Sequence, residues 1–371
     1  NTRLQVEHPV TELVTGQDLV ELMIRVADGE KLPISQEDVK LNGWAMESRV
    51  YAEDPFRNFL PSIGRLVKYE PPVGDNVRVD TGVYEGGEVS MYYDPMIAKL
   101  ITYGKDRNEA ISRMQDALDA YCIRGVQHNI SFLNALMVHP RFIEGRLTTN
   151  FIAEEYPDGF DASCVPSEEP AKAVVIAAMI HRQYMDRAAR LSGQLRGHER
   201  RVNDDWVVII GGEHHHVTAI PANGGFRVEY DGNSYDVTTE WALGQPLMHA
   251  TINGKSVCFQ VQRNGLWLRL FHRGNQTDAL VMTPRSAELH ALMPEKEAPD
   301  LSKFLLSPMP GLLVKVSVSE GQEVKAGEEL AVIEAMKMEN VLRAEQDGKV
   351  AAVKAEAGDS LKVDQIIIEF E

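Results

Sequence analysis

Residues 311–321 read GLLVKVSVSEG and residues 348–358 read GKVAAVKAEAG, so one pattern occurs twice near the C-terminus. Leu330 after the first copy matches Ile367 after the second. Apolar residues alternate in both copies, as half-buried strands require, and the flanking glycines suit turns with a positive φ. The repeat predicts that residues 304–371 form a flattened all-β barrel, built from two matched halves.

A lysine lies between the two halves. The connecting segment, residues 332–340, reads VIEAMKMEN, and Lys337 stands between Met336 and Met338. A solvated lysine in a β-hairpin is the ordinary interpretation. The position between the repeats and the two methionines favour a lysine that is presented for covalent loading. Its amine can form a stable amide with a carboxylic cofactor, and tethering raises the effective concentration of the carried group.

The N-terminal segment, residues 1–11, reads NTRLQVEHPVT and places Arg3, Gln5 and Glu7 at alternating positions. On an extended segment these three side chains share one face. A guanidinium, an amide and a carboxylate on one face suit a small oxyanion such as bicarbonate, and the carboxylate can act as a general base. Spacing alone also allows a salt-bridged strand on a sheet surface.

Local patterns predict the elements that follow. Residues 17–28 have apolar residues at helical spacing and are expected to form a helix with a packing face. Residues 44–52 alternate as a strand, which places Glu47, Arg49 and Tyr51 on one face. Residues 106–109 read DRNE, a pattern typical of a capping box.

Four stretches resemble biotin-dependent carboxylases. The tetrapeptide AMKM at 335–338 resembles their biotin attachment site, whereas lipoyl domains, which share the barrel, typically carry Asp-Lys-Ala. Residues 1–11 and the string ESRVYAEDP at 47–55 resemble the biotin carboxylase component, a member of the ATP-grasp superfamily. The string YYDPMIAKLI at 92–101 is also similar, and the resemblance runs to about residue 152.

The resemblance implies a fold, cofactors and residue roles. It implies biotin joined covalently to Lys337, together with ATP and Mg²⁺ or Mn²⁺, and it makes Asp94 and Lys99 structural or near the site. The roles that it implies are metal binding for Asn1, catalysis for Arg3 and Glu7, bicarbonate binding for Arg3, Gln5 and Val6, biotin-ring binding for Arg49 and biotin attachment for Lys337.

The middle of the chain, residues 157–293, contains fewer residues that suggest a catalytic or binding role. We expect a helix over residues 169–191, a basic loop over 190–201, and about eight short strands between 206 and 283. This pattern predicts an antiparallel barrel with a helix inserted in it or packed on it. His214, His215 and His216 cannot converge simply on a metal, because successive strand residues point to opposite faces.

The layout as a whole resembles the α subunits of propionyl-CoA carboxylases. It predicts a multidomain α+β chain with the end of a biotin carboxylase domain at 1–152, a mediator domain at 157–293, a linker at 294–303 and a biotin carrier domain at 304–371. The implied partners are a separate carboxyltransferase β subunit in an α6β6 assembly and biotin protein ligase. Two alternatives stay open: another acyl-CoA carboxylase α subunit, such as a methylcrotonyl-CoA enzyme, and a non-catalytic carrier or scaffold.

Composition bounds the function. The chain has 38 basic and 55 acidic residues and a net charge of −17, which argues against nucleic acid as a partner. It has no apolar run long enough to predict a membrane span. The three cysteines are expected to be reduced thiols of an intracellular protein. We expect a fragment that begins inside a catalytic motif and does not turn over ATP alone, from a bacterial cytoplasm in preference to a mitochondrial matrix.

Overall fold

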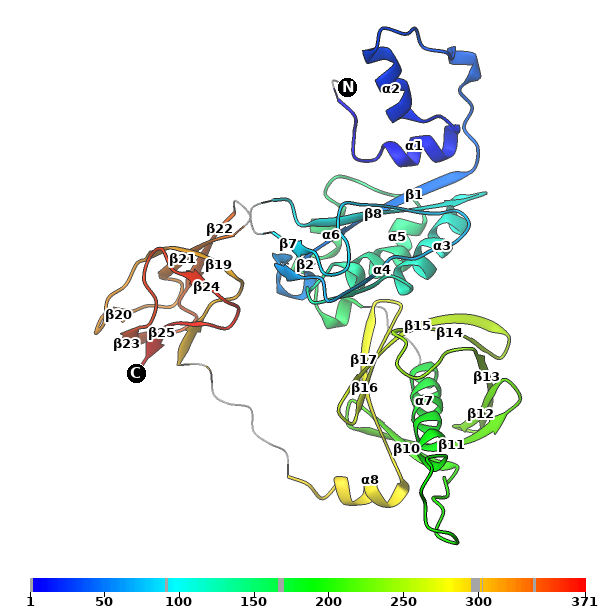
Figure 1. The fold of residues 1–371 in the computed structure, drawn as a ribbon. Coiled ribbons are helices and arrows are strands. Elements are labelled where there is room, and N and C mark those ends of the chain that lie inside the picture. The colour runs from blue at the N-terminus through cyan, green and yellow to red at the C-terminus, as the bar shows by residue number, and fades with distance from the viewer. Residues whose placement is uncertain (1–2, 91–92, 166–169, 295–300, 302, 336–337) are drawn as a thin grey trace.

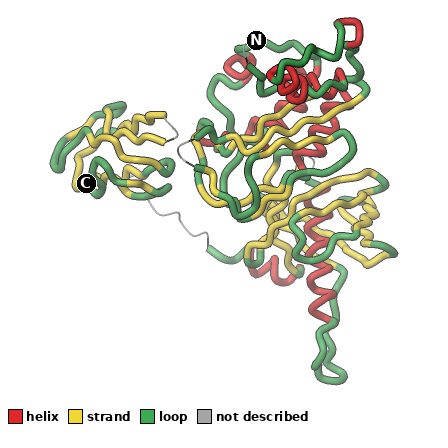
Figure 2. The backbone as a smooth tube through the Cα atoms, turned by 45° about the horizontal axis from the view of Figure 1, so that its top comes forward, coloured by secondary structure: helices red, strands yellow, loops and turns green. Residues whose placement is uncertain are grey.

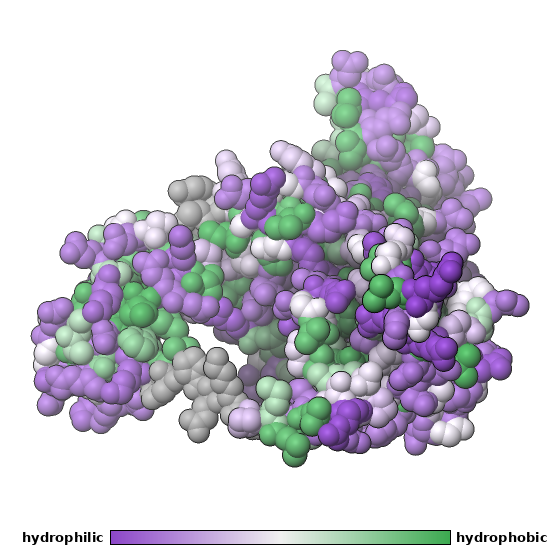
Figure 3. Space-filling view, turned by 60° about the horizontal axis from the view of Figure 1, so that its bottom comes forward, coloured by the Kyte–Doolittle hydropathy of each residue, from purple (hydrophilic) through white to green (hydrophobic). Residues whose placement is uncertain are grey.

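The computed structural model describes residues 3–90, 93–165, 170–294, 301, 303–335 and 338–371. Figure 1 shows an N-terminal α+β unit, a barrel around a helix and a smaller C-terminal β unit, which confirms the predicted fold class. Each unit has its own hydrophobic cluster. Hydrophilic side chains predominate on the face shown in Figure 3, and hydrophobic ones occur there in small groups.

The N-terminal unit is built on an antiparallel sheet of β1 (Trp44–Tyr51), β8 (Met96–Gly104) and β6 (Val77–Thr81), with β8 in the centre. Helix α3 (Arg107–Asp119) packs on the sheet through a stripe that includes Ile111, Met114 and Leu118. Its N-cap is Asp106, whose side chain accepts from the Glu109 amide. The Glu109 carboxylate accepts from the amide of Lys105, so the capping box closes one residue earlier than predicted.

Two helices precede the sheet, α1 (His8–Thr15) and α2 (Leu19–Ala27). The expected helix over residues 17–28 is present, and Asp18 caps its N-terminus. The packing face predicted for it is not formed: no residue of α2, all of which is described, is buried. Met23, Ile24 and Val26 are 48%, 65% and 49% exposed.

Shorter elements complete the N-terminal unit: η1 (Gln36–Asp38), β2 (Glu53–Asp54), η2 (Pro55–Arg57), β3 (Leu60–Pro61), β4 (Gly64–Arg65), β5 (Lys68–Glu70), β7 (Glu88–Val89), β9 (Cys122–Arg124), α4 (Ile130–Val138), α5 (Pro140–Ile143), α6 (Phe151–Glu155) and η3 (Ala162–Cys164). Beyond α6, Tyr156 and Phe160 still pack edge-on against Phe132 of α4.

Within the described range 170–294, eight antiparallel strands close into a barrel in sequence order. They are β10 (Asp205–Ile210), β11 (Glu213–Ala222), β12 (Gly225–Tyr230), β13 (Asn233–Thr239), β14 (Leu247–Ile252), β15 (Lys255–Asn264), β16 (Trp267–His272) and β17 (Asn275–Met282). Helix α7 (Ala171–Ala189) packs inside, and its buried residues share one cluster with inward-facing strand residues. The predicted barrel and its helix are confirmed, and a loop after α7 projects beyond the barrel (Figure 2).

The C-terminal unit follows α8 (Pro284–His290) and consists of two four-stranded sheets in its described residues. One has the order β18 (Phe304–Leu306), β25 (Ile366–Phe370), β23 (Gly348–Val353), β20 (Glu323–Val324); the other has β22 (Met338–Arg343), β21 (Glu329–Ala335), β19 (Gly311–Val316), β24 (Ser360–Leu361). Each sheet takes strands from both repeats. Leu330 and Ile367, the matched pair, are both fully buried, which confirms the two-halved barrel.

The N-terminal unit and the barrel are joined by the β16–β17 hairpin, which inserts beside the C-terminal end of α3. Asp119 accepts from the backbone amide of Arg273 at 2.7 Å, and Asp116 pairs with the Arg273 guanidinium at 2.6 Å. Gln260 of β15 donates to the carbonyls of Asp119 and Tyr121 at 2.9 and 3.1 Å. Asp119 and Gln260, both buried, are therefore paired across the contact.

Candidate active site

The N-terminal segment does not have the extended geometry predicted for Arg3, Gln5 and Glu7. Residues 5–8 form a turn, in which the His8 amide donates to the Gln5 carbonyl at 3.2 Å. Helix α1 begins at His8 with a proline in its first turn, and Glu7 is its N-cap residue. Proline is favoured there because its ring presets the helical φ and its missing N–H costs no hydrogen bond. The prediction that residues 3–7 form an extended segment with Arg3, Gln5 and Glu7 on one face is therefore wrong.

The turn brings Glu7 to the sheet that carries Arg49. An oxygen of Glu7 lies 3.6 Å from the Arg49 guanidinium, and Glu47, two residues before Arg49 on β1, lies 3.3 Å from its Nε. The predicted strand face of Glu47, Arg49 and Tyr51 is confirmed by the burial pattern of β1. Glu7 and Arg49 are 58% and 40% exposed, so this pair of side chains remains accessible.

Glu47 is the inner member of this group. Its side chain is only 7% exposed, and one carboxylate oxygen is buried without a hydrogen-bond partner. Burial raises the pKa of Glu47 above its ordinary value, and hydrogen bonding and charge attraction from Arg49 only partly offset the effect. Arg49 therefore stands between an exposed carboxylate and a buried one.

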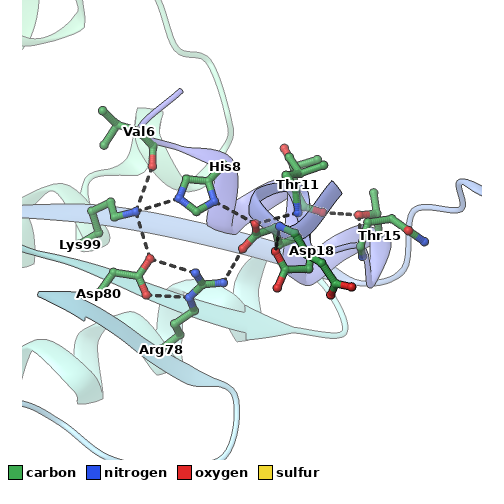
Figure 4. A network of polar contacts seen from close by, with 12 residues as sticks. Val6, His8, Thr11, Thr15, Asp18, Arg78, Asp80 and Lys99 are labelled. Carbon is green, nitrogen blue, oxygen red and sulfur yellow. Dashed lines mark hydrogen bonds and ion pairs between the residues drawn. The ribbon is translucent and has the colours of Figure 1, made fainter. Parts of the chain in front are cut away.

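Lys99 of β8 lies directly behind the turn (Figure 4). Its ammonium is 3.3 Å from His8 Nε2 and donates to the Val6 carbonyl at 3.4 Å. It also pairs with Asp80 of β6 at 3.0 Å. The near-site placement expected for Lys99 thus has a geometric basis, whereas Asp94 accepts from the Met96 amide at 2.9 Å in the turn before β8.

The structure describes fewer contacts for the other predicted site residues. Arg3 donates to the carbonyl of Leu4 at 3.3 Å and is exposed. Asn1, the predicted metal ligand, lies outside the described residues, as does Lys337. The strands on either side of Lys337 are described: Ala335, the last residue of β21, pairs with Met338, the first residue of β22.

Within the histidine triplet on β11, His215 contacts the Tyr230 hydroxyl at 2.9 Å. No metal-binding cluster of histidine, cysteine or acidic side chains occurs among the described residues. The described helices include none with the length and apolar character that a membrane crossing needs.

A cavity of about 790 Å³ lies elsewhere, where the loop around η2, the β16–β17 hairpin and residues 308–310 meet. None of the predicted site residues that the structure describes lines it. Glu7 and Arg49 instead lie on an open surface, away from this cavity.

Four protein-family models match successive parts of the chain. Residues 1–35 match the ATP-binding domain of the carbamoyl-phosphate synthase L chain, residues 47–154 the biotin carboxylase C-terminal domain, residues 174–296 the propionyl-coenzyme A carboxylase BT domain, and residues 303–370 the biotin-requiring enzyme domain.

Relatives match over the whole chain. The propionyl-CoA carboxylase alpha chain of Ruegeria pomeroyi is 52% identical, over 100% of this chain and 58% of that protein. The chain is similar over its whole length to the propionyl-CoA carboxylase α-chain family. The human mitochondrial member of this family is 43% identical, with 52% of its length covered. The α subunit of mouse methylcrotonoyl-CoA carboxylase is 35% identical, with 53% of its length covered. The chain thus spans between half and three fifths of the length of these three relatives.

The sequence analysis did not identify a set of polar contacts close to Glu7. Lys99 contacts Asp80 and His8, and the further contacts of these two residues lead to Arg78 and Glu12 (Figure 4). His8 to Glu12 is an i,i+4 spacing on α1, which could have indicated that pair. Arg78 and Asp80 alternate on β6, but no local signal tied β6 to the N-terminal turn.

Proposed function

We propose that the full-length protein is the biotin-carboxylating α chain of a propionyl-CoA carboxylase. It uses ATP and bicarbonate to carboxylate biotin joined to Lys337, and a separate β subunit transfers the carboxyl group to propionyl-CoA, giving methylmalonyl-CoA. The observation that carries the proposal is the pairing of Glu7 with Arg49 at 3.6 Å, on an accessible surface and in the same chain as a biotin-requiring domain.

Glu7 is proposed as the base that removes the proton of bicarbonate. Its carboxylate is more than half exposed and is held toward the sheet by a cation, so it can face a bound substrate. Arg3, Gln5 and the amide of Val6 are proposed to hold the bicarbonate, which then attacks the γ-phosphate of ATP to give carboxyphosphate and ADP. Arg3 adds positive charge where negative charge develops.

Arg49 is proposed to bind the biotin ring and to stabilise the negative charge that develops on it. Biotin, when attached, supplies the ureido nitrogen that accepts the carboxyl group. The chain fits this group in two respects. Arg49 keeps 40% of its side chain exposed although two carboxylates contact it, and the pairing of Ala335 with Met338 supports a short connection between β21 and β22 as the attachment segment.

The proposal includes domains, metal and partners. The domain bounds 1–152, 157–293, 294–303 and 304–371 and the role of Asn1 in binding Mg²⁺ or Mn²⁺ remain predictions. The match to the BT domain supports a mediator that binds the carboxyltransferase subunit. An α6β6 assembly and loading by biotin protein ligase belong to the same proposal. A location in a bacterial cytoplasm, in preference to a mitochondrial matrix, belongs to the same proposal.

Two other functions are weighed against it. A methylcrotonyl-CoA carboxylase α subunit would share both end domains, but identity to such a relative is 35% against 52%. A non-catalytic carrier would need Lys337 alone, and the Glu7–Arg49–Glu47 group would then have no use.

One experiment separates these functions. The full-length protein is purified with its associated subunit, its intact mass is measured, and carboxylation is assayed with a panel of acyl-CoA substrates. We expect the mass increment of one biotin and a clear preference for propionyl-CoA. Preference for methylcrotonyl-CoA would select the related carboxylase, and biotin without any bicarbonate-dependent ATP cleavage would select the carrier.

A further inference from the structure

Next to the turn that carries Glu7, five charged or polar side chains form a closed ring of contacts: Lys99, Asp80, Arg78, Glu12 and His8. Figure 4 shows this network. Lys99 Nζ lies 3.0 Å from Asp80, Asp80 takes a two-pronged contact from Arg78 at 2.7 and 3.0 Å, and Arg78 pairs with Glu12 at 2.7 Å. The other Glu12 oxygen is 3.0 Å from His8 Nδ1, and His8 Nε2 is 3.3 Å from Lys99. With a neutral imidazole, two cations balance two carboxylates.

Lys99 is the member of this ring that reaches the turn. On the sheet it is the cross-strand neighbour of both Arg49 on β1 and Asp80 on β6. Its ammonium contacts Val6 and His8, the residues on either side of Glu7. One side chain therefore connects the strand position of Arg49 to the turn that carries Glu7.

The turn has few other means of attachment. Only Pro9 and Glu12 of α1 are buried, so apolar packing holds the helix weakly on the sheet. Lys99 is 13% exposed and Glu12 8% exposed, and charge-assisted hydrogen bonds removed from water in this way are stronger than exposed ones. The ring is thus the main polar connection between α1 and the β6–β8 edge in the described residues.

The ionisation of the two carboxylates fits this arrangement. Burial alone would raise the pKa of Asp80, but hydrogen bonds from Arg78 and Lys99 outweigh it and leave the pKa below its ordinary value. The pKa of Glu12 is lowered in the same way, against burial, by hydrogen bonds with Arg78 and His8. Both acids are ionised at neutral pH, so the ring is intact there.

We propose that Lys99 is a positioning residue for the carboxylation step, which holds the Val6–His8 turn so that the Glu7 carboxylate and the Val6 amide face bicarbonate together. This inference rests on the proposed function. Lys99 forms no bond to substrate and transfers no proton. Its effect comes through the turn, where a displacement of about 1 Å is enough to lower a rate about 100-fold.

The test uses the full-length protein with its partner subunit, and compares Lys99→Met, Lys99→Arg and Lys105→Met. Lys105 is exposed just beyond β8 and outside the ring, so its variant is the matched control. We expect Lys99→Met to lower kcat/KM for bicarbonate about 100-fold, with the KM for ATP within about twofold of wild type. Lys99→Arg keeps a cation that can donate, and should recover at least part of the loss.

A second readout does not depend on activity. Amide hydrogen exchange in the segment 3–12 should be faster in Lys99→Met than in wild type and unchanged in Lys105→Met. If Lys99→Met does not fold, Asp80→Asn replaces it, and the same direction of change is expected with a smaller size.

The outcomes separate the two levels of proposal. A Lys99→Met protein with normal bicarbonate kinetics, or with equal losses for ATP and bicarbonate and no recovery in Lys99→Arg, would overturn the positioning role. If the wild-type protein shows no bicarbonate-dependent ATP cleavage, the proposed function itself is wrong.

Discussion

The carboxylate of Asp119 accepts a hydrogen bond of 2.7 Å from the backbone amide of Arg273, across 154 residues of sequence. Asp119 is the last residue of α3 and its side chain is 2% exposed; Arg273 lies in the tight turn of the β16–β17 hairpin. The same carboxylate is 3.3 Å from His272. This buried carboxylate therefore connects the end of α3 in the N-terminal unit to the β16–β17 hairpin of the barrel.

Gly274→Ala should loosen this contact. Gly274 has φ +79°, and an added Cβ would lie 2.9 Å from Asn134 and 3.0 Å from the Ser131 carbonyl. Gly254→Ala, at φ +78° in the β14–β15 hairpin with open space, is the control. The control should lose about 1 kcal/mol of stability to backbone strain alone. Gly274→Ala should lose about 1–3 kcal/mol more by overpacking. Calorimetric unfolding measures both, and equal losses would contradict a tight interface.

Lys337→Arg should abolish binding of the full-length protein to avidin. Arginine retains the positive charge but cannot form the lysine amide that biotin attachment needs. Lys325→Arg is the control, because Lys325 is an exposed lysine of the same unit that pairs with Asp347 at 2.9 Å. Avidin blotting and intact mass report the outcome, and a biotinylated Lys337→Arg protein would place the attachment site elsewhere.

Glu7→Gln should lower the rate of bicarbonate-dependent ATP cleavage about 100-fold or more, because a general base typically contributes that much to a rate. The amide keeps the size of the side chain and the turn before α1. Glu21→Gln on the exposed helix α2 controls for the loss of a carboxylate near the N-terminus. ADP release with and without bicarbonate measures the effect. Near-normal rates in Glu7→Gln would exclude this residue as the base.

Acid should weaken the attachment of α1. Glu12 and Asp80 have pKa values held below their ordinary 4.5 and 3.8. A carboxyl with a lowered folded-state pKa contributes stability that is present above its unfolded value and lost as pH falls through the folded value. Hydrogen exchange in residues 3–12 should therefore rise steeply below about pH 4.5, relative to the intrinsic rate. Glu12→Gln should flatten that pH dependence, whereas Glu37→Gln, on the exposed turn η1, should leave it unchanged.

Elements with a strong local period were predictable. The barrel strands alternate apolar and polar residues and are separated by pairs such as Asp231-Gly232 and Asn253-Gly254, all four with positive φ in the structure. The two halves of the C-terminal unit follow from the repeat, since matched residues such as Leu330 and Ile367 reach equivalent buried positions. These features depend on residues close in sequence, which one chain displays.

The turn before α1 was mistaken for an extended segment because alternation was given more weight than Pro9. A proline near the start of an apolar stretch is itself a helix-start signal. The ring next to the turn that carries Glu7 could not have been predicted, because it depends on the pairing of Asp80 with Lys99 across β6 and β8. That register is a tertiary property, and the residues concerned have ordinary sequence surroundings.

The contact between Asp119 and the β16–β17 hairpin also sets a geometric limit. Because it fixes the barrel to the sheet that carries Arg49, travel of the C-terminal unit depends on the segment that follows α8. The ten residues 294–303 span at most about 35 Å when fully extended. Under the proposed function, every active site that the carrier domain visits lies within a sphere around residue 293. The radius of this sphere is the length of the extended segment plus the size of the carrier domain. The acceptor pocket of the partner subunit must fall within the same sphere.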